Sequence, residues 1–388
     1  MAMRQNSAID FVVKLSKYCN LRCSYCYEFE QLGDRRRMSL DSLRAFFAHV
    51  ADAAGRYGRR RIDFIWHGGE PLLIPLDTYL AIGELQREVI GERAEVLNLL
   101  QTNLTVLTDR HLEFLGAKRF FAEGIGVSFD VYGDQRVDVL GQLRTETVLA
   151  NIQRLREAGI AFGAITVLAR NTLPHIEAIF RFYDSLGISF RILPFYKSAF
   201  EEQVQAHALD YEEIVGAFCA VFDAWLVSPT ATRVFPLDDY LGYALAAIAG
   251  GEKRFHDPAQ GETVFLVDTD GETYGVADTY AQGHAYGNVF KQDFSDVLAS
   301  PERTQAVAAA NARMEKHCTH CPYHGYCPGT FAADATAEQR RMLDDEGCPV
   351  REVIAHMIRR VEHMEVAVRL NGSQGTRQPA EPALAIDL

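Results

Sequence analysis

Strand-like and helix-like segments alternate along the first half of the chain, and this alternation limits the possible folds more than any other feature. Six short apolar runs have the length and composition of buried strands: Phe11–Leu15, Ile62–Trp66, Val96–Leu100, Gly124–Phe129, Phe162–Leu168 and Phe190–Leu193. Amphipathic stretches of helical length separate them. The pattern predicts a parallel sheet, in either an incomplete barrel or an open doubly wound sheet. In both folds, functional side chains belong at the carboxyl ends of the strands.

Beyond residue 195 the alternation of strand and helix stops. Helical patterns come first, and then Val264–Val267 and Glu272–Tyr274 flank a Gly-containing turn that is typical of a hairpin. A cysteine-rich stretch and a helical pattern follow, and the last residues are polar and contain proline. We expect four parts: a first domain of residues 1–195, a helical linker of 196–261, a small α+β domain of 262–370, and a disordered tail of 371–388.

The composition argues against some classes of protein. Of the 388 residues, 48% are hydrophobic and 23% are charged, as in an ordinary globular protein, and the formal net charge is −13. Proteins that bind nucleic acid need basic surfaces to neutralise phosphates, so the acidic balance argues against a nucleic-acid partner. The sequence has no apolar run long enough to span a membrane and no signal peptide. We therefore expect a cytoplasmic protein with no membrane partner.

Seven of the eight cysteines stand in two groups, one near each end of the chain. Clustered cysteines in a large chain without a secretion signal indicate metal binding rather than disulfides. The first group, Cys19, Cys23 and Cys26, directly follows the first predicted strand. Three thiolates can hold three irons of a [4Fe–4S] cluster and leave the fourth iron open to a ligand. The alternatives are a zinc site that lacks one ligand, and unconnected thiols.

This segment resembles the radical S-adenosylmethionine (SAM) superfamily. Cys19, Cys23 and Cys26 match its CxxxCxxC motif, and Tyr25 matches the aromatic residue before the last cysteine. The resemblance implies a partial (β/α)6 TIM barrel and an oxygen-sensitive enzyme in which SAM chelates the open iron. It further implies that an electron from a flavodoxin- or ferredoxin-type donor cleaves SAM to a 5′-deoxyadenosyl radical, which abstracts hydrogen from the substrate.

Short motifs after the later strands continue the resemblance. The family has a GGEP segment after the second strand, a QTN segment after the third and a VSxD pattern at the fourth. It also has an arginine that pairs with the SAM carboxylate and an apolar adenine contact after the sixth strand. The residues that the resemblance implies for SAM binding are Tyr25, Gly68, Gly69, Glu70, Gln101, Asn103, Ser128, Asp130, Arg136 and Leu193.

The second cysteine group contains four potential ligands: Cys318, Cys321, Cys327 and Cys348. Four thiolates suit a closed redox cluster, and a structural zinc knuckle is the alternative. Together with the predicted barrel, the group resembles the SPASM domain of peptide-modifying radical SAM enzymes, which implies an auxiliary [4Fe–4S] cluster. The fuller family pattern has further cysteines where this chain has Tyr274-Gly275-Val276 and Phe331. We therefore expect the first auxiliary cluster to be missing, and two clusters in all.

The resemblance favours oxidative modification of a peptide, namely a carbon–carbon or thioether cross-link in a ribosomally made precursor. Only eighteen residues precede Cys19, which is too few for an N-terminal leader-binding domain. A dehydrogenase or epimerase acting on a small amino acid, sugar or alcohol would use the same clusters. A zinc-stabilised binding protein that has lost catalysis is the second alternative.

Further side chains are candidates for the chemistry on the substrate. Asp278 is the carboxylate nearest to the position of the catalytic aspartate in sulfatase-maturing members, and it could act as a base. Cys219 could donate a hydrogen atom, although its place on an apolar helical face also suits a structural role. His67 stands beside the glycine pair, near the expected SAM site. Tyr196 and Lys197 follow the sixth strand and could face the substrate.

Overall fold

Six parallel strands, placed side by side in chain order, form the centre of a single sheet. In a computed structural model of the chain they are β1 (Ala8–Ser16), β2 (Arg61–Gly68), β3 (Glu95–Thr102), β4 (Ile125–Ser128), β5 (Phe162–Leu168) and β6 (Phe190–Pro194). Each strand pairs in parallel with the next. A doubly wound sheet would reverse its strand order at a switch point. The sequential order therefore confirms the predicted partial barrel.

The structure describes residues 8–56, 59–122, 124–195, 206–277, 279–280 and 283–371, with side chains described to residue 364. Asp278, Tyr196 and Lys197 lie outside the described residues, so the roles predicted for them stay predictions. Across the described ranges, no helix is both long enough and apolar enough to cross a membrane.

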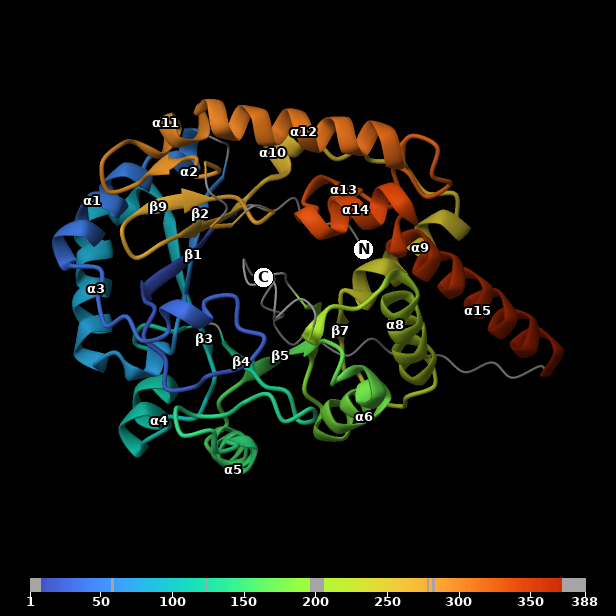
Figure 1. Cartoon of the computed structure of the whole chain (residues 1–388), viewed down its shortest axis with the longest axis horizontal. Helices are drawn as coiled ribbons and strands as arrows, with labels where there is room; N and C mark the ends of the chain where they lie inside the picture. Colours follow the sequence, from blue (N-terminus) through green and yellow to red (C-terminus); the bar gives the residue numbers. More distant parts are fainter. Residues whose placement is uncertain are drawn as a thin grey trace.

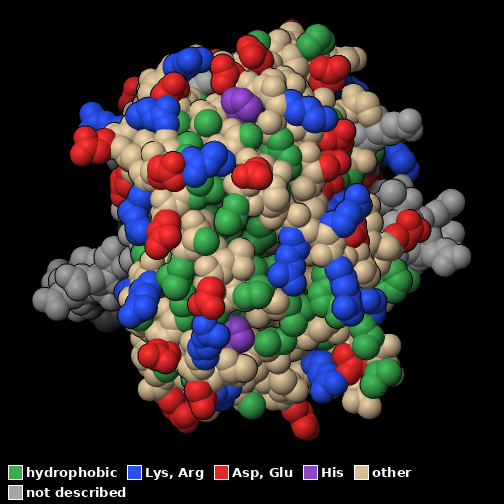
Figure 2. All heavy atoms as spheres, turned by 90° about the vertical axis from the view of Figure 1, so that its left-hand side faces the viewer, with side chains coloured by type: hydrophobic (Ala, Val, Ile, Leu, Met, Phe, Trp, Pro, Cys, Tyr) green, Lys and Arg blue, Asp and Glu red, His purple; other side chains and the backbone are tan. Residues whose placement is uncertain are grey.

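Helices connect the strands and cover the outer face of the curved sheet (Figure 1). They are α1 (Leu40–Val50), α2 (Ala53–Arg56), α3 (Leu76–Val89), α4 (Asp109–Gly116), α5 (Thr145–Glu157) and α6 (Ile176–Leu186). Short 3-10 turns occur at Phe29–Gln31, Pro71–Leu73, Gly91–Arg93 and Leu173–His175. On the face built from α1 and α3, basic and acidic side chains are interspersed (Figure 2), and Arg44 pairs with Glu88 at 2.7 Å between the two helices.

Later segments extend the sheet at both edges. β7 (Val234–Phe235) pairs with β6, and β8 (Val264–Val267) pairs in parallel with β1. The predicted hairpin is present, with β9 (Glu272–Tyr274) antiparallel to β8, and β10 (Gly287–Asn288) adds one more strand. The hairpin of the predicted second domain therefore continues the sheet of the first.

Of the remaining helices, α11 (Phe294–Leu298) lies at the hairpin edge of the sheet beside α2, and the others lie along the open side of the sheet and at its β7 edge (Figure 1). The others are α8 (Tyr211–Leu226), α9 (Leu237–Ile248), α10 (Pro258–Gly261), α12 (Pro301–Cys318), α13 (Thr330–Ala333), α14 (Ala337–Asp345) and α15 (Pro349–Asn371). α15 packs against α8 and α9. The long α12 runs from the hairpin edge of the sheet toward α9 and carries Cys318 at its end.

Aromatic side chains join the hairpin edge to the core of the barrel. Phe11 of β1 is fully buried, and its ring lies 5.3 Å from Phe46 of α1 and 5.0 Å from Phe294 of α11. Phe265 of β8 lies 5.0 Å from the same Phe294 ring. Rings at these separations add specific contacts to the large apolar area that they bury. The core therefore fixes β8 and α11 against β1, beside the loop that carries the first cysteines.

Candidate active site

The first cysteine group lies in the loop after β1. Cys19 and Cys23 are buried and Cys26 is half-buried, and all three pack against Leu21 or Leu32. The N–H of Cys26 donates to the carbonyl of Cys23 at 3.0 Å, which folds the loop into a turn. None of the eight cysteines, all of which are described, forms a disulfide. The three thiols line one wall of a cavity and remain able to bind a metal cluster.

Burial determines the charge of these thiols. It raises the pKa of Cys19 and of Cys26 to about 12, and it raises the pKa of Cys23 as well. Arg136 lowers the pKa of Cys23 and Lys14 lowers that of Cys26, but burial outweighs both cations, so the three thiols are protonated at neutral pH when no metal is bound. Metal binding requires thiolates and releases their protons, so a positively charged iron cluster would stabilise the ionised form that burial disfavours.

The glycine pair after β2 supports the cysteine loop. The N–H of Gly69 donates to Ser16 at 2.9 Å, and the N–H of Glu70 donates to Tyr18 at 3.0 Å. A Cβ on Gly68 would lie 2.1 Å from the Ser16 carbonyl oxygen, and one on Gly69 would lie 2.1 Å from that of Tyr18. Only glycine permits this close approach of two backbones. These two N–H groups are therefore engaged within the protein and are not available to a ligand.

Glu70 connects the ends of β2 and β3 from inside the protein. Its Oε1 accepts from the Thr102 hydroxyl at 2.7 Å and from the Leu72 N–H at 2.8 Å. Its Oε2 accepts from the Asn103 N–H at 2.7 Å. Both carboxylate oxygens are thus engaged by protein donors, which gives Glu70 a positioning role. Its predicted contact with SAM stays a prediction.

Gln101 and Ser128 present an unmet hydrogen-bond acceptor at the cavity. The Nε2 of Gln101 donates to Ser128 Oγ at 2.7 Å. The Oε1 of Gln101 is buried and has no partner among the described residues. It lies above Gly126, where a Cβ would approach to 1.9 Å. Since a buried polar atom without a partner is costly, a ligand that donates an amino or hydroxyl hydrogen would be stabilised here.

Asp130 orients two of the predicted SAM contacts. Its Oδ1 accepts from the Thr166 hydroxyl at 3.0 Å and from the Val167 N–H at 2.7 Å. Its Oδ2 accepts from Arg136 Nε at 3.1 Å and from the Tyr25 hydroxyl. Burial opposes the charge of Arg136, but Tyr25 and Asp130 raise its pKa above the usual value. Arg136 therefore places a fixed positive charge at the cavity wall, which suits a carboxylate ligand.

Asn103 lies beside the first cysteine group, whereas Leu193 lies partly exposed at the end of β6. The amide of Asn103 donates to Cys19 Sγ at 3.6 Å and to Asn20 Oδ1 at 3.1 Å. Asn103 thus contacts a cysteine of the first group, and it also lines the cavity. Leu193 lies at the end of β6, is 40% exposed and lines the same cavity. An exposed leucine at a cavity mouth can pack against an apolar or aromatic part of a ligand.

The structure contains a buried network of charges beside the cysteine loop, which the sequence analysis did not predict. Lys14 lies within β1 with its side chain fully buried, and its ammonium donates to Glu28 at 2.9 Å, to His67 Nδ1 at 3.2 Å and to Tyr27. Tyr280 donates to the same Glu28 oxygen at 2.7 Å. Burial alone would lower the pKa of Lys14, but Glu28 raises it above the usual value, so the lysine stays charged.

The same network determines the protonation state of His67. Burial, followed by the charge of Lys14, lowers the pKa of His67 to about 3, so the imidazole is neutral. Its Nδ1 accepts from the Gly68 N–H at 2.7 Å, which places the ring proton on Nε2. His67 lines the cavity, as expected from its position beside the glycine pair. A lysine inside the apolar run Phe11–Leu15 was the sequence signal for this network.

The second cysteine group lines the same cavity. Cys318 ends α12, Cys321 and Cys327 follow in the next loop, and Cys348 directly precedes α15. Burial raises the pKa of Cys318 to about 11 and that of Cys327 to about 12, and the neighbouring thiols raise both further. All seven grouped cysteines line one cavity of about 800 Å³. In the described part of the chain, no three Cys, His, Asp or Glu side chains lie close enough to hold one metal ion directly.

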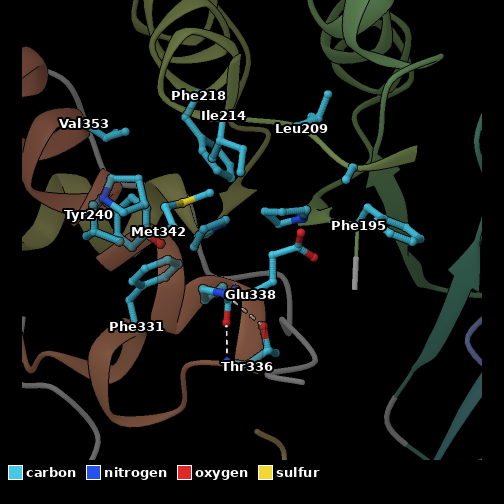
Figure 3. Close-up of a pocket in the computed structure, with 16 residues that line it drawn as sticks. Phe195, Leu209, Ile214, Phe218, Tyr240, Phe331, Thr336, Glu338, Met342 and Val353 are labelled. Carbon is cyan, nitrogen blue, oxygen red and sulfur yellow. Dashed lines mark hydrogen bonds between the residues drawn. The ribbon is translucent and has the colours of Figure 1, made fainter. Parts of the chain in front are cut away.

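A smaller cavity of about 130 Å³ adjoins the large one (Figure 3). Its wall is mostly apolar and includes Phe195, Ile214, Phe218 and Met342. Phe331, which stands where the fuller family pattern has a cysteine, lines both cavities. That position therefore contributes an aromatic ring to an apolar wall.

Cys219 has the surroundings of a structural residue. It lies half-buried on α8 and packs against the main core, and burial raises the pKa of its thiol to about 11. It is not among the residues that line the large cavity. This placement favours the structural alternative over hydrogen-atom donation.

Comparisons with known proteins agree with this architecture. Residues 13–183 match the radical SAM superfamily. The cysteine-type anaerobic sulfatase-maturating enzyme of Clostridium novyi (strain NT) is 22% identical over 327 residues, which cover 80% of this chain and 84% of that protein. The serine-type anaerobic sulfatase-maturating enzyme of Klebsiella pneumoniae is 24% identical over 330 residues, which cover 84% and 82% respectively.

Solved structures show the same fold over most of the chain. Native anSMEcpe with bound AdoMet and the Cp18Cys peptide has a TM-score of 0.70 at 18% identity, covering 94% of this chain and 100% of that one. SuiB from Streptococcus suis, bound to S-adenosylmethionine, has a TM-score of 0.58 at 15% identity, covering 88% and 75%. Together with the strand order and the motif positions, the match over residues 13–183 shows that the chain carries a radical SAM domain.

Proposed function

We propose that the chain oxidises a side chain of a peptide, and that conversion of a cysteine or serine to formylglycine is the first candidate reaction. The single observation that carries the proposal is the common cavity lined by both cysteine groups. A SAM-cleaving site at the first group and a closed four-cysteine site at the second would therefore share one substrate space. Sulfatase-maturating relatives that align over about four-fifths of the chain support the peptide class of substrate.

The residues on the cavity wall fit the cofactors that this reaction requires. Cys19, Cys23 and Cys26 would hold a [4Fe–4S] cluster with one open iron, and the four later cysteines would hold an auxiliary [4Fe–4S] cluster. SAM would be bound by the Arg136 cation and the unmet Gln101 acceptor. When bound, these groups supply a 5′-deoxyadenosyl radical and an acceptor for one electron.

The chain's own residues position this chemistry. Glu70 and Asp130 engage all their carboxylate oxygens within the protein, which fixes the ends of β2, β3 and β4 around the ligand space. Asn103 donates a hydrogen bond to a cysteine of the first group, and such bonds to sulfur influence the reduction potential of a cluster. Beyond the effect of burial, the charges of Glu28 and Lys14 in the buried network lie close enough to Cys26 to act on the pKa of its thiol in opposite directions, Glu28 raising it and Lys14 lowering it.

A cross-link is the second candidate reaction. Tyr274-Gly275-Val276 and Phe331 stand where the fuller sulfatase-maturing pattern has cysteines. With these cysteines replaced, Val276 and Phe331 supply apolar side chains to the wall of the large cavity. The wall therefore differs from that pattern, and a carbon–carbon or thioether cross-link is the alternative outcome.

Mass spectrometry of a treated peptide separates the two reactions. The reconstituted holoenzyme is incubated anaerobically with SAM, dithionite and a synthetic peptide that contains one cysteine. Formylglycine formation exchanges the sulfur for oxygen with loss of two hydrogens, and the product reacts with a hydrazide. A cross-link removes two hydrogens, retains the sulfur and leaves no aldehyde. Release of 5′-deoxyadenosine with no change in any cysteine or serine peptide would contradict the peptide proposal.

Asp334 is a candidate proton acceptor for this oxidation. It directly follows α13 and lines the large cavity. Burial by the surrounding protein and the nearby Glu262 carboxylate raise the pKa of Asp334 to about 6, whereas Arg313 opposes the shift. A carboxylate with such a pKa is ionised at neutral pH and is a stronger base than an ordinary aspartate.

The rate of peptide oxidation is expected to rise with pH through about 6, because Asp334 accepts a proton only when ionised. Asp334→Asn should remove this rise and lower the peptide turnover about 100-fold, while 5′-deoxyadenosine release continues. Asp334→Glu should restore much of the turnover and keep a pH-dependent limb. If Asp334→Asn retained the pH profile of the parent enzyme, another group would have to accept the proton.

A further inference from the structure

The proposed function needs one electron from outside the protein for each cleavage of SAM, and the structure indicates where that electron enters. Cys19 and Cys23 are buried, but the residues between and beside them reach the surface. Arg22 is half-buried and Ser24 is exposed. This strip is therefore the outer surface of the first cysteine site.

Residues 137–143 form a neighbouring turn that is bonded directly to this strip. The N–H of Arg22 donates to the Val137 carbonyl at 2.7 Å, and Leu21 forms an antiparallel bridge with Asp138. The Ser24 hydroxyl donates to Gln135. The turn and the cysteine loop are thus one continuous surface.

A single buried carboxylate makes the turn rigid. Asp138 Oδ1 accepts from the Leu140 N–H at 2.8 Å and from the Gln142 N–H at 3.0 Å. Its Oδ2 accepts from Arg144 Nε at 2.9 Å, and a bridge between Val137 and Leu143 closes the turn. These hydrogen bonds lower the pKa of Asp138, so the carboxylate stays ionised at neutral pH.

The rigid turn holds apolar side chains in solvent. Val139 is 60% exposed, Leu140 is 77% exposed and Leu143 is 49% exposed. A single exposed leucine is ordinary, but three large apolar side chains fixed in one seven-residue turn form a patch of the kind found at interaction sites. Because Asp138 holds the backbone, the turn cannot rearrange to bury them.

The cysteine loop beside the patch is locally basic, unlike the chain as a whole with its net charge of −13. The charged side chains of residues 18–38 that reach the surface are four arginines and two carboxylates: Arg22, Arg35, Arg36, Arg37, Glu30 and Asp34. Arg36 pairs with Asp34 at 2.6 Å and also faces Asp268 and Asp270 of the hairpin, so the excess positive charge comes from Arg22, Arg35 and Arg37. The neighbouring turn follows one exposed carboxylate, Asp134. An acidic partner is therefore repelled by the protein in general and attracted to this loop.

We propose that the turn 137–143 and the cysteine loop form the docking surface for flavodoxin, the small acidic flavoprotein that supplies the electron. The apolar edge of its flavin would pack against Val139 and Leu140, and its acidic rim would face the arginines of the loop. The flavin loses one electron, the first cluster gains it, and no bond of either protein forms or breaks. This inference rests on the proposed SAM cleavage.

The test compares two reductants on the same holoenzyme. Val139→Ser/Leu140→Ser is the test variant, and Val227→Ser is the matched control, because Val227 is 72% exposed at the end of α8. With reduced flavodoxin, the second-order rate of cluster reduction, followed by stopped-flow absorbance, should fall about tenfold or more in the test variant only. With dithionite, both variants should release 5′-deoxyadenosine at the parent rate. The parent rate with flavodoxin should also fall as salt is added.

Direct binding supplies a second readout. The Kd of oxidised flavodoxin for the holoenzyme should rise about tenfold in the test variant and stay unchanged in Val227→Ser. Equal flavodoxin rates and Kd values for parent and test variant would overturn the docking site. If the test variant were reduced more slowly by ferredoxin but at the parent rate by flavodoxin, the choice of partner would be overturned. Failure of the parent enzyme to cleave SAM with dithionite would instead refute the proposed function and is distinguishable from both.

Discussion

Cys23→Ala protein, reconstituted without oxygen, is expected to release no 5′-deoxyadenosine from SAM and to hold about four irons per chain instead of about eight. Cys23 is the middle cysteine of the first group and is buried at the cavity wall. Its removal leaves two thiolates at a site that needs three. Iron and sulfide analysis and chromatography of the nucleoside products measure both effects.

Two other cysteines provide matched controls for this experiment. Cys219→Ala removes the one cysteine outside the two groups and should keep about eight irons and full SAM cleavage. Cys348→Ala should keep the first cluster and SAM cleavage but lose about four irons and the turnover of the peptide. Zinc in place of iron in the parent protein, or 5′-deoxyadenosine release by Cys23→Ala, would contradict the assignment of the first site.

The second large effect concerns stability. Lys14→Met is expected to lower the free energy of unfolding by about 3–5 kcal/mol, because it leaves the Glu28 carboxylate buried without its cation. Lys14 has no exposed side-chain surface and Glu28 has 3%. The second Glu28 oxygen already lacks a partner among the described residues, so the Tyr280 hydroxyl would be left as the hydrogen-bond donor to the carboxylate. Anaerobic urea unfolding followed by circular dichroism measures the change.

Removing the unpaired buried carboxylate as well should restore most of the lost free energy of unfolding. In Lys14→Met/Glu28→Gln the buried carboxylate is replaced by a neutral amide that can still accept from Tyr280, so most of the stability should return. Arg44→Met breaks an exposed ion pair with Glu88 and should cause a far smaller change. A double variant as unstable as Lys14→Met would show that lysine packing, and not the unpaired charge, is responsible.

The sequence was sufficient to predict the central strands because their apolar runs are local and continuous. The strands expected at Phe11–Leu15 and Phe162–Leu168 are contained in β1 and β5, and the hairpin strands lie where the Gly-containing turn predicts them. The pairing of β8 with β1 was not predictable, because it joins segments about 250 residues apart and no local pattern encodes that register. β7 was not predictable either, because its two residues are too few to show the alternating pattern of a strand.

The candidate site was predictable only where a motif places a side chain directly. The cysteines line one cavity, together with Tyr25, Gln101, Ser128 and Arg136, as their positions after the strands suggest. The finer roles of Glu70, Asp130 and Asn103 depend on which hydrogen bonds the fold has already satisfied, and a linear sequence does not contain that information. Asp334 comes near Glu262 only through the path of α12 and α13.

The pairing of β8 with β1 has a consequence for how the protein matures in the cell. Two links close over the first cysteine loop from the far end of the chain: Lys17 to Asp268 at 2.7 Å, and Tyr280 to Glu28. A ribosome has to release more than 260 residues before either link can form. Until then, the loop that carries Cys19, Cys23 and Cys26 lacks both links. The geometry of the first cysteine site therefore depends on residues about 250 positions further along the chain, and it is complete only after the hairpin has folded onto β1.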